Sequence, residues 1–551
     1  MKPTTTLYHN ANILTGARSS PRATAMAVTG GRISAIGDLS TVGKTVSPDA
    51  QQVDLQGAHV MPGMIDIHNH HEMAGRSILY ETLFPPSLDF DGILSLVRKA
   101  AETTPAGRWV VGESFGSHHL PRMDSLEALK QLDDAGLGRP VLLRDDSHHN
   151  RWVNTAAMRA AGVDEQTPFS CVGGIAKDAA TGRLTGVFME DATQLVDRVM
   201  EDTNYADPAL HLRAVQEGIA VLNAHGVTAI QDAQTFHDML VAVSDLDRQG
   251  GLNAWVVASL PIKVFMYQPG PIGIELFEMK ERFRTRHVRP DFAKFVLDGV
   301  PTNRTAALLE PYRPTPATCC YRGGATLTLP QFARLLAECE RHGLAAKIHC
   351  AGDGAARLAL DGIEVVRNFE GRRPSQKRHQ IAHATLLGAG DVQRMAALDV
   401  VADMSPVLWY PGLLEQALRH TLPDELVDNL SPIRDMVEAG VLVTGGTDWP
   451  VCPFPNVWDG FEGMVTRANP EGSADATLGK HQAIDAATAL QVYTLNSAEA
   501  LGLDTETGSL EPGKSADFII VDQDVLAIEP RKIAKTRVLS TWFEGRKVFE
   551  L

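Results

Sequence analysis

Short apolar segments that alternate with longer helical stretches constrain the fold of this chain more than any other feature. Such alternation is typical of a parallel α/β protein, in which a helix follows each strand. The sequence predicts ten such strands, and the stretch from roughly 72 to 215 holds two of them and an irregular middle at 164–204. If it is an insertion after the first strand, eight strands remain, the number that a (β/α)8 TIM-type barrel needs. A doubly wound open sheet is the alternative. The ten predicted strands are 64–68, 109–112, 141–144, 228–231, 254–260, 293–297, 345–349, 380–383, 400–404 and 442–446.

Both ends of the chain have a different texture, with short β-rich segments separated by Gly, Pro and Asp turns. We expect them to form one small β-sandwich domain from 1–60 and 501–551, attached to a barrel over 61–500 with the insertion at about 72–215. The predicted strands of this domain are 7–14, 24–28, 32–36, 52–55, 515–521 and 537–549.

Composition narrows the classes of partner. The 551 residues carry a net charge of −16, which is unfavourable for nucleic acid or an anionic membrane because phosphate binding needs a surface rich in Lys and Arg. The six cysteines form no C-x-x-C pair, and neither a signal peptide nor an apolar run of membrane-spanning length occurs. We therefore expect a cytoplasmic protein with a small-molecule substrate. The oligomeric state is open, and a homodimer is one alternative.

The segment Asp66-Ile-His68-Asn-His70 is the first candidate for chemistry. Residues two apart on a strand share a face, so His68 and His70 can present two imidazoles to one metal. An isolated pair of this kind is weak evidence, since surface or core histidines give the same pattern.

Three further segments strengthen the metal interpretation. His349, His383 and Asp448 each end an apolar strand, and the carboxyl ends of barrel strands face the active site. Histidine nitrogens and a carboxylate are the ligands that zinc and similar metals prefer. We therefore expect one or two divalent ions, with Zn²⁺ as the first choice.

Lys294 lies in the apolar segment Phe292-Ala-Lys-Phe-Val-Leu-Asp298. A buried lysine needs a partner or must lose its charge. Carboxylation by carbon dioxide would convert it into an anionic ligand that bridges two metals. An ion pair with Asp298 is the alternative.

Several motifs together resemble the amidohydrolase superfamily, and within it the YtcJ-like group, amidohydrolase family 3, with its N-substituted formamide deformylase-type hydrolases. The likeness covers nearly the whole chain. The metal motif is Met61-Pro-Gly-Met-Ile-Asp-Ile-His-Asn-His70, and Ser147-His-His-Asn-Arg-Trp-Val-Asn154 resembles a motif of the group's insertion. The opening and closing signatures are Asn10-Ala-Asn-Ile-Leu-Thr-Gly16, Gly30-Gly-Arg-Ile-Ser-Ala-Ile-Gly37, Asn496-Ser-Ala-Glu-Ala-Leu-Gly502 and Gly508-Ser-Leu-Glu-Pro-Gly-Lys-Ser-Ala-Asp-Phe518.

The resemblance implies a ligand set. His68, His70 and Asp448 would bind the more buried metal, His349 and His383 the more exposed one, and carboxylated Lys294 would bridge them. The chain departs from the group's pattern where His71 and Glu72 directly follow the H-x-H motif, and where Ser147 and His148 stand in the insertion motif. These departures affect the analogy in substrate and leave the ligands intact.

The expected reaction is hydrolysis of a C–N bond by metal-activated water, on an N-substituted amide, formamide or carbamate-like molecule. Asp448 is the candidate general acid and base, and His383 and His149 are candidate partners of the oxyanion. A cyclic amidohydrolase or a deaminase of the same superfamily is the first rival, and a metal-free structural relative is the second. Candidate substrate-binding residues in loops, for which plain packing is the alternative, are Trp449, Trp409, Tyr410, Arg304 and Tyr312.

Overall fold

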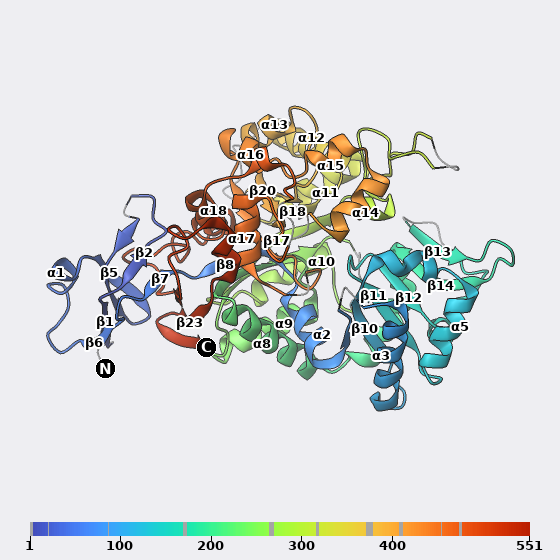
Figure 1. Cartoon of the computed structure of the whole chain (residues 1–551), viewed down its shortest axis with the longest axis horizontal. Helices are drawn as coiled ribbons and strands as arrows, with labels where there is room; N and C mark the ends of the chain where they lie inside the picture. Colours follow the sequence, from blue (N-terminus) through green and yellow to red (C-terminus); the bar gives the residue numbers. More distant parts are fainter. Residues whose placement is uncertain are drawn as a thin grey trace.

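An eight-stranded parallel sheet that curves into a nearly closed barrel forms the centre of the computed structural model (Figure 1). The fold class expected from the sequence is confirmed, and the eight strands fall where eight of the ten were predicted. They are β8 (Met64–Asn69), β15 (Val227–Asp232), β16 (Trp255–Pro261), β17 (Val288–Val296), β18 (Ala345–His349), β19 (Gln380–His383), β20 (Val401–Met404) and β21 (Val443–Gly445), paired in that order. The structure describes residues 4–19, 21–85, 88–168, 173–263, 269–315, 319–370, 378–406, 411–452, 454–472 and 476–551.

The seam between the first and last barrel strands is joined by backbone contacts beyond the regular ladder. Asn69 and Trp449 form a parallel bridge, and the backbone NH of Asp448 donates to the carbonyl oxygen of His68 at 2.7 Å. The loop after β21 is therefore fixed against the end of β8.

Alternation along β18 shows how the barrel wall divides its side chains. Ala346 and Ile348 pack in the apolar core that the barrel shares with its outer helices, among them α11 (Leu329–Arg341) and α12 (Asp353–Glu370). Because successive residues of a strand point to opposite faces, Lys347 and His349 face the barrel interior. The interior of this barrel therefore contains charged and polar groups as well as apolar ones.

The insertion between β8 and β15 is a lobe of its own, on the far side of the barrel from the N-terminal strands (Figure 1). Its six-stranded sheet has the order β13-β14-β12-β11-β10-β9. These strands are β9 (Thr82–Leu83), β10 (Val110–Phe115), β11 (Val141–Asp145), β12 (Asn150–Val153), β13 (Gly173–Lys177) and β14 (Leu184–Glu190). Helices α2 (His71–Tyr80) and α8 (Pro208–Ala224) pack together where the lobe leaves and rejoins the barrel.

The prediction that 164–204 is irregular is wrong for much of that stretch. It holds β13, β14 and the helix α7 (Gln194–Asn204). β13 lies at the edge of the sheet, is partly exposed and begins with two glycines, so its sequence lacks an apolar signal. In α7, Val196 and Met200 are buried one turn apart, a pattern that the many charged neighbours obscure.

Strands from both chain ends share a six-stranded sheet with the order β24-β23-β22-β7-β2-β3. In it β7 (His59–Pro62) pairs antiparallel with β22 (Phe518–Val521), and a four-stranded sheet of N-terminal strands packs nearby. The rings of Phe518 and Trp542 stack with centroids 5.2 Å apart, and Tyr8 meets Phe518 edge-on at 5.4 Å. This is the small β-sandwich of the expected fold class. The described helices include none with the length and apolar character that a bilayer crossing requires.

Candidate metal centre

Three ligand atoms converge at the carboxyl ends of β8 and β21. The Nε2 atoms of His68 and His70 each lie 3.5 Å from Oδ1 of Asp448. Ligand bonds of about 2.0–2.1 Å in tetrahedral geometry place neighbouring donor atoms about 3.4 Å apart. The spacing and the nitrogen–oxygen donor set therefore fit one divalent metal ion.

The backbone around Asp448 is held in an unusual conformation. Asp448 has φ 57°, in the left-handed region that a residue with a Cβ adopts only when its surroundings enforce it. The backbone NH and the hydroxyl of Thr447 both donate to the buried carboxylate of Asp66, at 3.0 and 2.6 Å. Gly446 permits the close approach, because a Cβ at that position would lie 2.5 Å from the backbone nitrogen of His68. These contacts aim the Asp448 carboxylate at the two imidazoles.

His383 and His349 lie beside these three residues. Nε2 of His383 is 3.0 Å from Nδ1 of His349, and Nδ1 of His383 is 3.9 Å from Oδ2 of Asp448. Burial lowers the pKa of His383 to about 4 and keeps the pKa of His349 well below its usual value. Both imidazoles are therefore neutral at pH 7, which is the form that binds metals.

Lys294 projects from β17 with only 5 % of its surface exposed. Burial lowers the pKa of its amine to about 8, with nearby Lys347 acting in the same direction and Asp448 against it. Asp298, the alternative ion-pair partner, instead accepts backbone hydrogen bonds from Ala307, Ala351 and Gly352 at 2.9–3.0 Å. The contacts of Asp298 thus favour a role in fixing the loops around His349.

One histidine of the insertion reaches the same centre. The ring of His149 lies 5.9 Å from that of His349, and its Nδ1 is 2.7 Å from Oε2 of Glu190. Burial disfavours its charged form, but the Glu190 carboxylate outweighs burial and raises the pKa of His149. The other carboxylate oxygen of Glu190 accepts from the hydroxyl of Thr305 at 2.6 Å. The insertion and the loop after β17 are thereby joined beside the candidate ligands.

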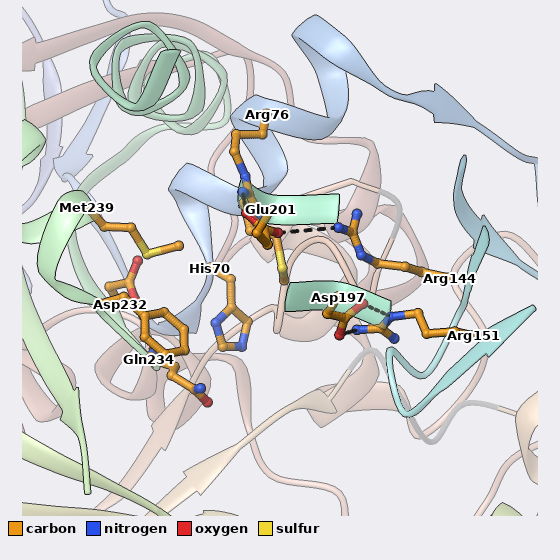
Figure 2. Close-up of a pocket in the computed structure, with 11 residues that line it drawn as sticks. His70, Arg76, Arg144, Arg151, Asp197, Glu201, Asp232, Gln234 and Met239 are labelled. Atoms are coloured by element: carbon orange, nitrogen blue, oxygen red, sulfur yellow. Dashed lines mark hydrogen bonds and ion pairs between the residues drawn. The ribbon is translucent and has the colours of Figure 1, made fainter. Parts of the chain in front are cut away.

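A pocket opens next to His70, between the barrel and the insertion (Figure 2). Figure 2 shows Met239, Asp232 and Gln234 on one side of His70 and three arginines with their acidic partners on the other. The arginines are ion-paired: Arg76 with Glu201 at 2.6 Å, Arg144 with Glu81 and Glu113 at 2.8 and 3.0 Å, and Arg151 with Asp197 at 2.9 Å. The pocket therefore presents no unpaired arginine to an acidic substrate among its described residues, which are His70, Met73, Arg76, Arg144, Arg151, Asp197, Glu201, Asp232, Gln234, Phe236 and Met239.

Comparison with known proteins identifies the family. The sequence model described as "Amidohydrolase family" matches residues 51–549. The chain belongs to the amidohydrolase family. The resemblance inferred from the sequence motifs is thereby confirmed, and members of this superfamily are metal-dependent hydrolases.

Individual relatives agree with this assignment over their full length. The N-substituted formamide deformylase of Arthrobacter pascens is 29 % identical over 97 % of this chain and 96 % of its own. The Bacillus subtilis amidohydrolase YtcJ is 25 % identical over 99 % of both chains. A crystal structure of a metal-dependent hydrolase from Pyrococcus horikoshii has the same fold, with a TM-score of 0.76, 22 % identity and coverage of 96 % of this chain and 99 % of that one.

The three predicted substrate-binding residues that the structure describes, Trp449, Tyr312 and Arg304, are not among the residues that line the pocket. Trp449 is 2 % exposed and packs in the barrel core, although its carbonyl oxygen accepts from the backbone NH of His70 at 2.8 Å. Tyr312 donates its hydroxyl hydrogen to the carbonyl oxygen of Ala306, and Arg304 donates to that of Arg313. Trp409 and Tyr410 fall outside the described residues.

Two charged residues of the amidohydrolase barrel escaped the sequence analysis. Asp403 accepts a hydrogen bond from Nδ1 of His68 at 2.7 Å, and Lys347 contacts the same carboxylate oxygen at 2.5 Å. Lys347 was detectable in principle, because it lies two residues before His349 and so shares its face of the strand. Asp403 sits in a short apolar strand whose contacts depend on closure of the barrel.

Proposed function

We propose that this amidohydrolase cleaves a C–N bond in an uncharged N-substituted amide, formamide or carbamate-like molecule. The observation that carries this proposal is the charge balance beside His70, where the neighbouring arginines are all paired with carboxylates. This balance disfavours an acidic substrate, and the small cavity of about 20 Å³ beside His70 is also lined by the apolar side chains of Met73, Phe236 and Met239. The full-length likeness to a formamide deformylase supports the same substrate class.

The residues proposed to hold metal are His68, His70 and Asp448 for one ion and His349 and His383 for a second. A bound divalent ion such as Zn²⁺ lowers the pKa of coordinated water and polarises a carbonyl oxygen. The protein supplies two imidazoles and one carboxylate within 4.8 Å of one another for the first ion. Zn²⁺ is the ion that we propose for these ligands.

Asp448 is the proposed proton carrier. Its Oδ1 faces His68 and His70, while its Oδ2 lies on the side of His383. One carboxylate oxygen is thus placed to accept a proton from the attacking water and to deliver it to the leaving nitrogen as the C–N bond breaks. The products are an amine and a carboxylic acid, or an amine and a carbonic acid monoester for a carbamate, so the water atoms are fully accounted for.

His149 is the proposed donor to the substrate's carbonyl oxygen. Its Nδ1 is held by Glu190 at 2.7 Å, which fixes the ring and directs Nε2 away from that carboxylate. The raised pKa of His149 favours the form in which Nε2 carries a hydrogen. A preorganised donor at the position where negative charge develops stabilises the transition state. His383, whose ring lies 4.7 Å from that of His349, is a second candidate for this role.

Substitution of Lys294 tests the bridging ligand. We expect Lys294→Ala to lower the number of metal ions bound per chain, because carboxylation of a partly neutral buried amine would no longer supply a shared ligand. Short carboxylic acids such as acetate should restore part of the metal content. Elemental analysis of the purified protein measures this, with Lys130→Ala at an exposed position as the control. Unchanged metal content in Lys294→Ala would refute the bridging role.

A substrate panel tests the proposed reaction. Metal-loaded protein is assayed with linear N-substituted formamides, amides and carbamates, with acidic analogues of each, and with cyclic imides and amino-heterocycles. We expect turnover of uncharged linear substrates and little of the acidic ones. Preference for cyclic imides or for amino-heterocycles would replace the proposal with ring opening or deamination.

A further inference from the structure

A buried lysine ammonium group lies in the barrel interior close to the candidate metal centre. Lys347 is fully buried, and its Nζ contacts four oxygens: the carbonyl of Ile67 at 2.9 Å, Gln231 Oε1 at 3.2 Å, Gln380 Oε1 at 3.0 Å and Asp403 Oδ2 at 2.5 Å. The interior of a (β/α)8 barrel is usually filled by layers of branched apolar side chains. Here one charged group connects β18 to β8, β15, β19 and β20.

The same carboxylate oxygen that meets Lys347 also meets a candidate ligand. Oδ2 of Asp403 is 2.7 Å from Nδ1 of His68. A carboxylate oxygen can only accept at this contact, so Nδ1 carries the hydrogen and the lone pair lies on Nε2. Nε2 is the atom 3.5 Å from Asp448 Oδ1 and thus the atom directed at the proposed metal. The contact therefore selects the ring orientation and the tautomer that a metal needs.

Lys347 fixes Asp403 in turn. Removal of either charge would leave the other buried without its counter-charge, which is strongly unfavourable. Two of the three remaining contacts of Lys347 lie close to ligands in the sequence: Ile67 precedes His68, and Gln380 is three residues before His383. We propose that Lys347 and Asp403 are a positioning pair that presets His68, and the spacing of the strands that carry the ligands, for the metal. This inference rests on the proposed metal-dependent function.

The variant Lys347→Met with Asp403→Asn tests the pair without leaving a lone buried charge. Replacing both members of a buried ion pair by groups of similar size is commonly tolerated, so this double variant is the one expected to fold. Metal is removed with a chelator, and the affinity for added Zn²⁺ is measured by competition with a chelating dye. We expect the affinity to fall by roughly 10–100-fold, the usual effect of losing the partner of a metal-binding histidine. The Co²⁺ absorption spectrum should change as well, because the neutral amide is a weaker acceptor than the carboxylate and holds the imidazole of His68 less firmly.

Controls separate positioning from general destabilisation. Asp517→Asn removes another buried carboxylate, which accepts from Trp255 Nε1 at 2.9 Å in the β-sandwich. It should lower the unfolding temperature but leave the Zn²⁺ affinity and the Co²⁺ spectrum unchanged. If Lys347 acts through Asp403, the double variant should bind Zn²⁺ no more weakly than Asp403→Asn alone, and Asp403→Glu should recover part of the affinity.

Measurements on the wild type and on the variants distinguish failure of the positioning role from failure of the proposed metal-dependent function. Wild-type protein that binds no Zn²⁺ would overturn the metal-dependent function itself. Wild-type binding with undiminished affinity and an unchanged Co²⁺ spectrum in the double variant would overturn the positioning role alone. Additive losses from the two single substitutions would show that Lys347 does not act through Asp403 and would likewise overturn the pair.

Discussion

Asp448→Asn is expected to cut turnover by roughly 10²–10⁴-fold, the usual contribution of a positioned acid–base group, while metal content stays close to that of the wild type. The amide oxygen of asparagine can still occupy the position 3.5 Å from both His68 and His70. The amide cannot accept and return a proton at neutral pH, however, so the proton transfers would lose their carrier. Elemental analysis and steady-state kinetics on one preparation measure the two effects together.

Two comparisons make the Asp448 result specific. Asp424→Asn changes an exposed aspartate that pairs with Arg313 on the surface, and it should leave both metal content and turnover unchanged. His70→Ala removes a proposed ligand and should lower both. If Asp448→Asn behaves like His70→Ala, the residue is a ligand first and its proton-transfer role is unsupported. Retained turnover would exclude Asp448 as the acid–base group.

The barrel could be predicted from the sequence because its strands are buried on both faces. Segments such as Ala345–His349 and Gln380–His383 are apolar runs that end in a polar residue, and that pattern survives without knowledge of the fold. β13 and β14 of the insertion could not be found in the same way. β13 lies at the sheet edge and begins with Gly173 and Gly174, so neither alternation nor an apolar run marks it.

The candidate site likewise contains residues that could be predicted from the sequence and residues that could not. His68, His70, His349, His383 and Asp448 could be predicted because each ends a strand, and the structure brings them together. The contact between His68 and Asp403 joins residues 335 positions apart, and it exists only once closure of the barrel brings β20 to within two strands of β8. Glu190 likewise acts at His149 through a sheet whose strands were only partly recognised. The local sequence pattern identifies the residues at strand ends, whereas the partners of those residues are brought to them only by closure of the barrel.

The ion pairs around the pocket could not be predicted from the sequence. Arg76, Arg144 and Arg151 are far from obvious as a group, and by composition alone arginines beside an active site suggest an acidic substrate. Their carboxylate partners lie on α7 (Asp197 and Glu201), on β10 (Glu113) and directly after α2 (Glu81). Only the folded arrangement shows that the charges are balanced.

Arg144→Met is expected to lower the stability of the insertion by roughly 3–5 kcal/mol, the cost of removing one partner from a buried ion pair. Arg144 is 3 % exposed and lies 2.8 Å from Glu81, 3.0 Å from Glu113 and 3.7 Å from Glu201. Its loss leaves three buried carboxylates, and of these Glu201 keeps an ion pair with Arg76 at 2.6 Å. Because so large a chain need not unfold in one step, amide hydrogen exchange of β10 and β11 is the suitable measurement.

The exposed pair of Lys130 and Asp134 provides the matched control within the same lobe. Its partners are 75 % and 65 % exposed, so Lys130→Met should leave stability nearly unchanged. Replacing Arg144 and Glu113 together, by Met and Gln, should recover part of the loss, since it removes one uncompensated charge along with its partner. Equal exchange in Arg144→Met and Lys130→Met would show that the buried network does not stabilise the insertion.

A loss of protection in Arg144→Met alone would link the stability of the insertion to turnover, because the same lobe carries His149 to within 5.9 Å of His349. Faster exchange in β11 should then be accompanied by lower turnover at unchanged metal content.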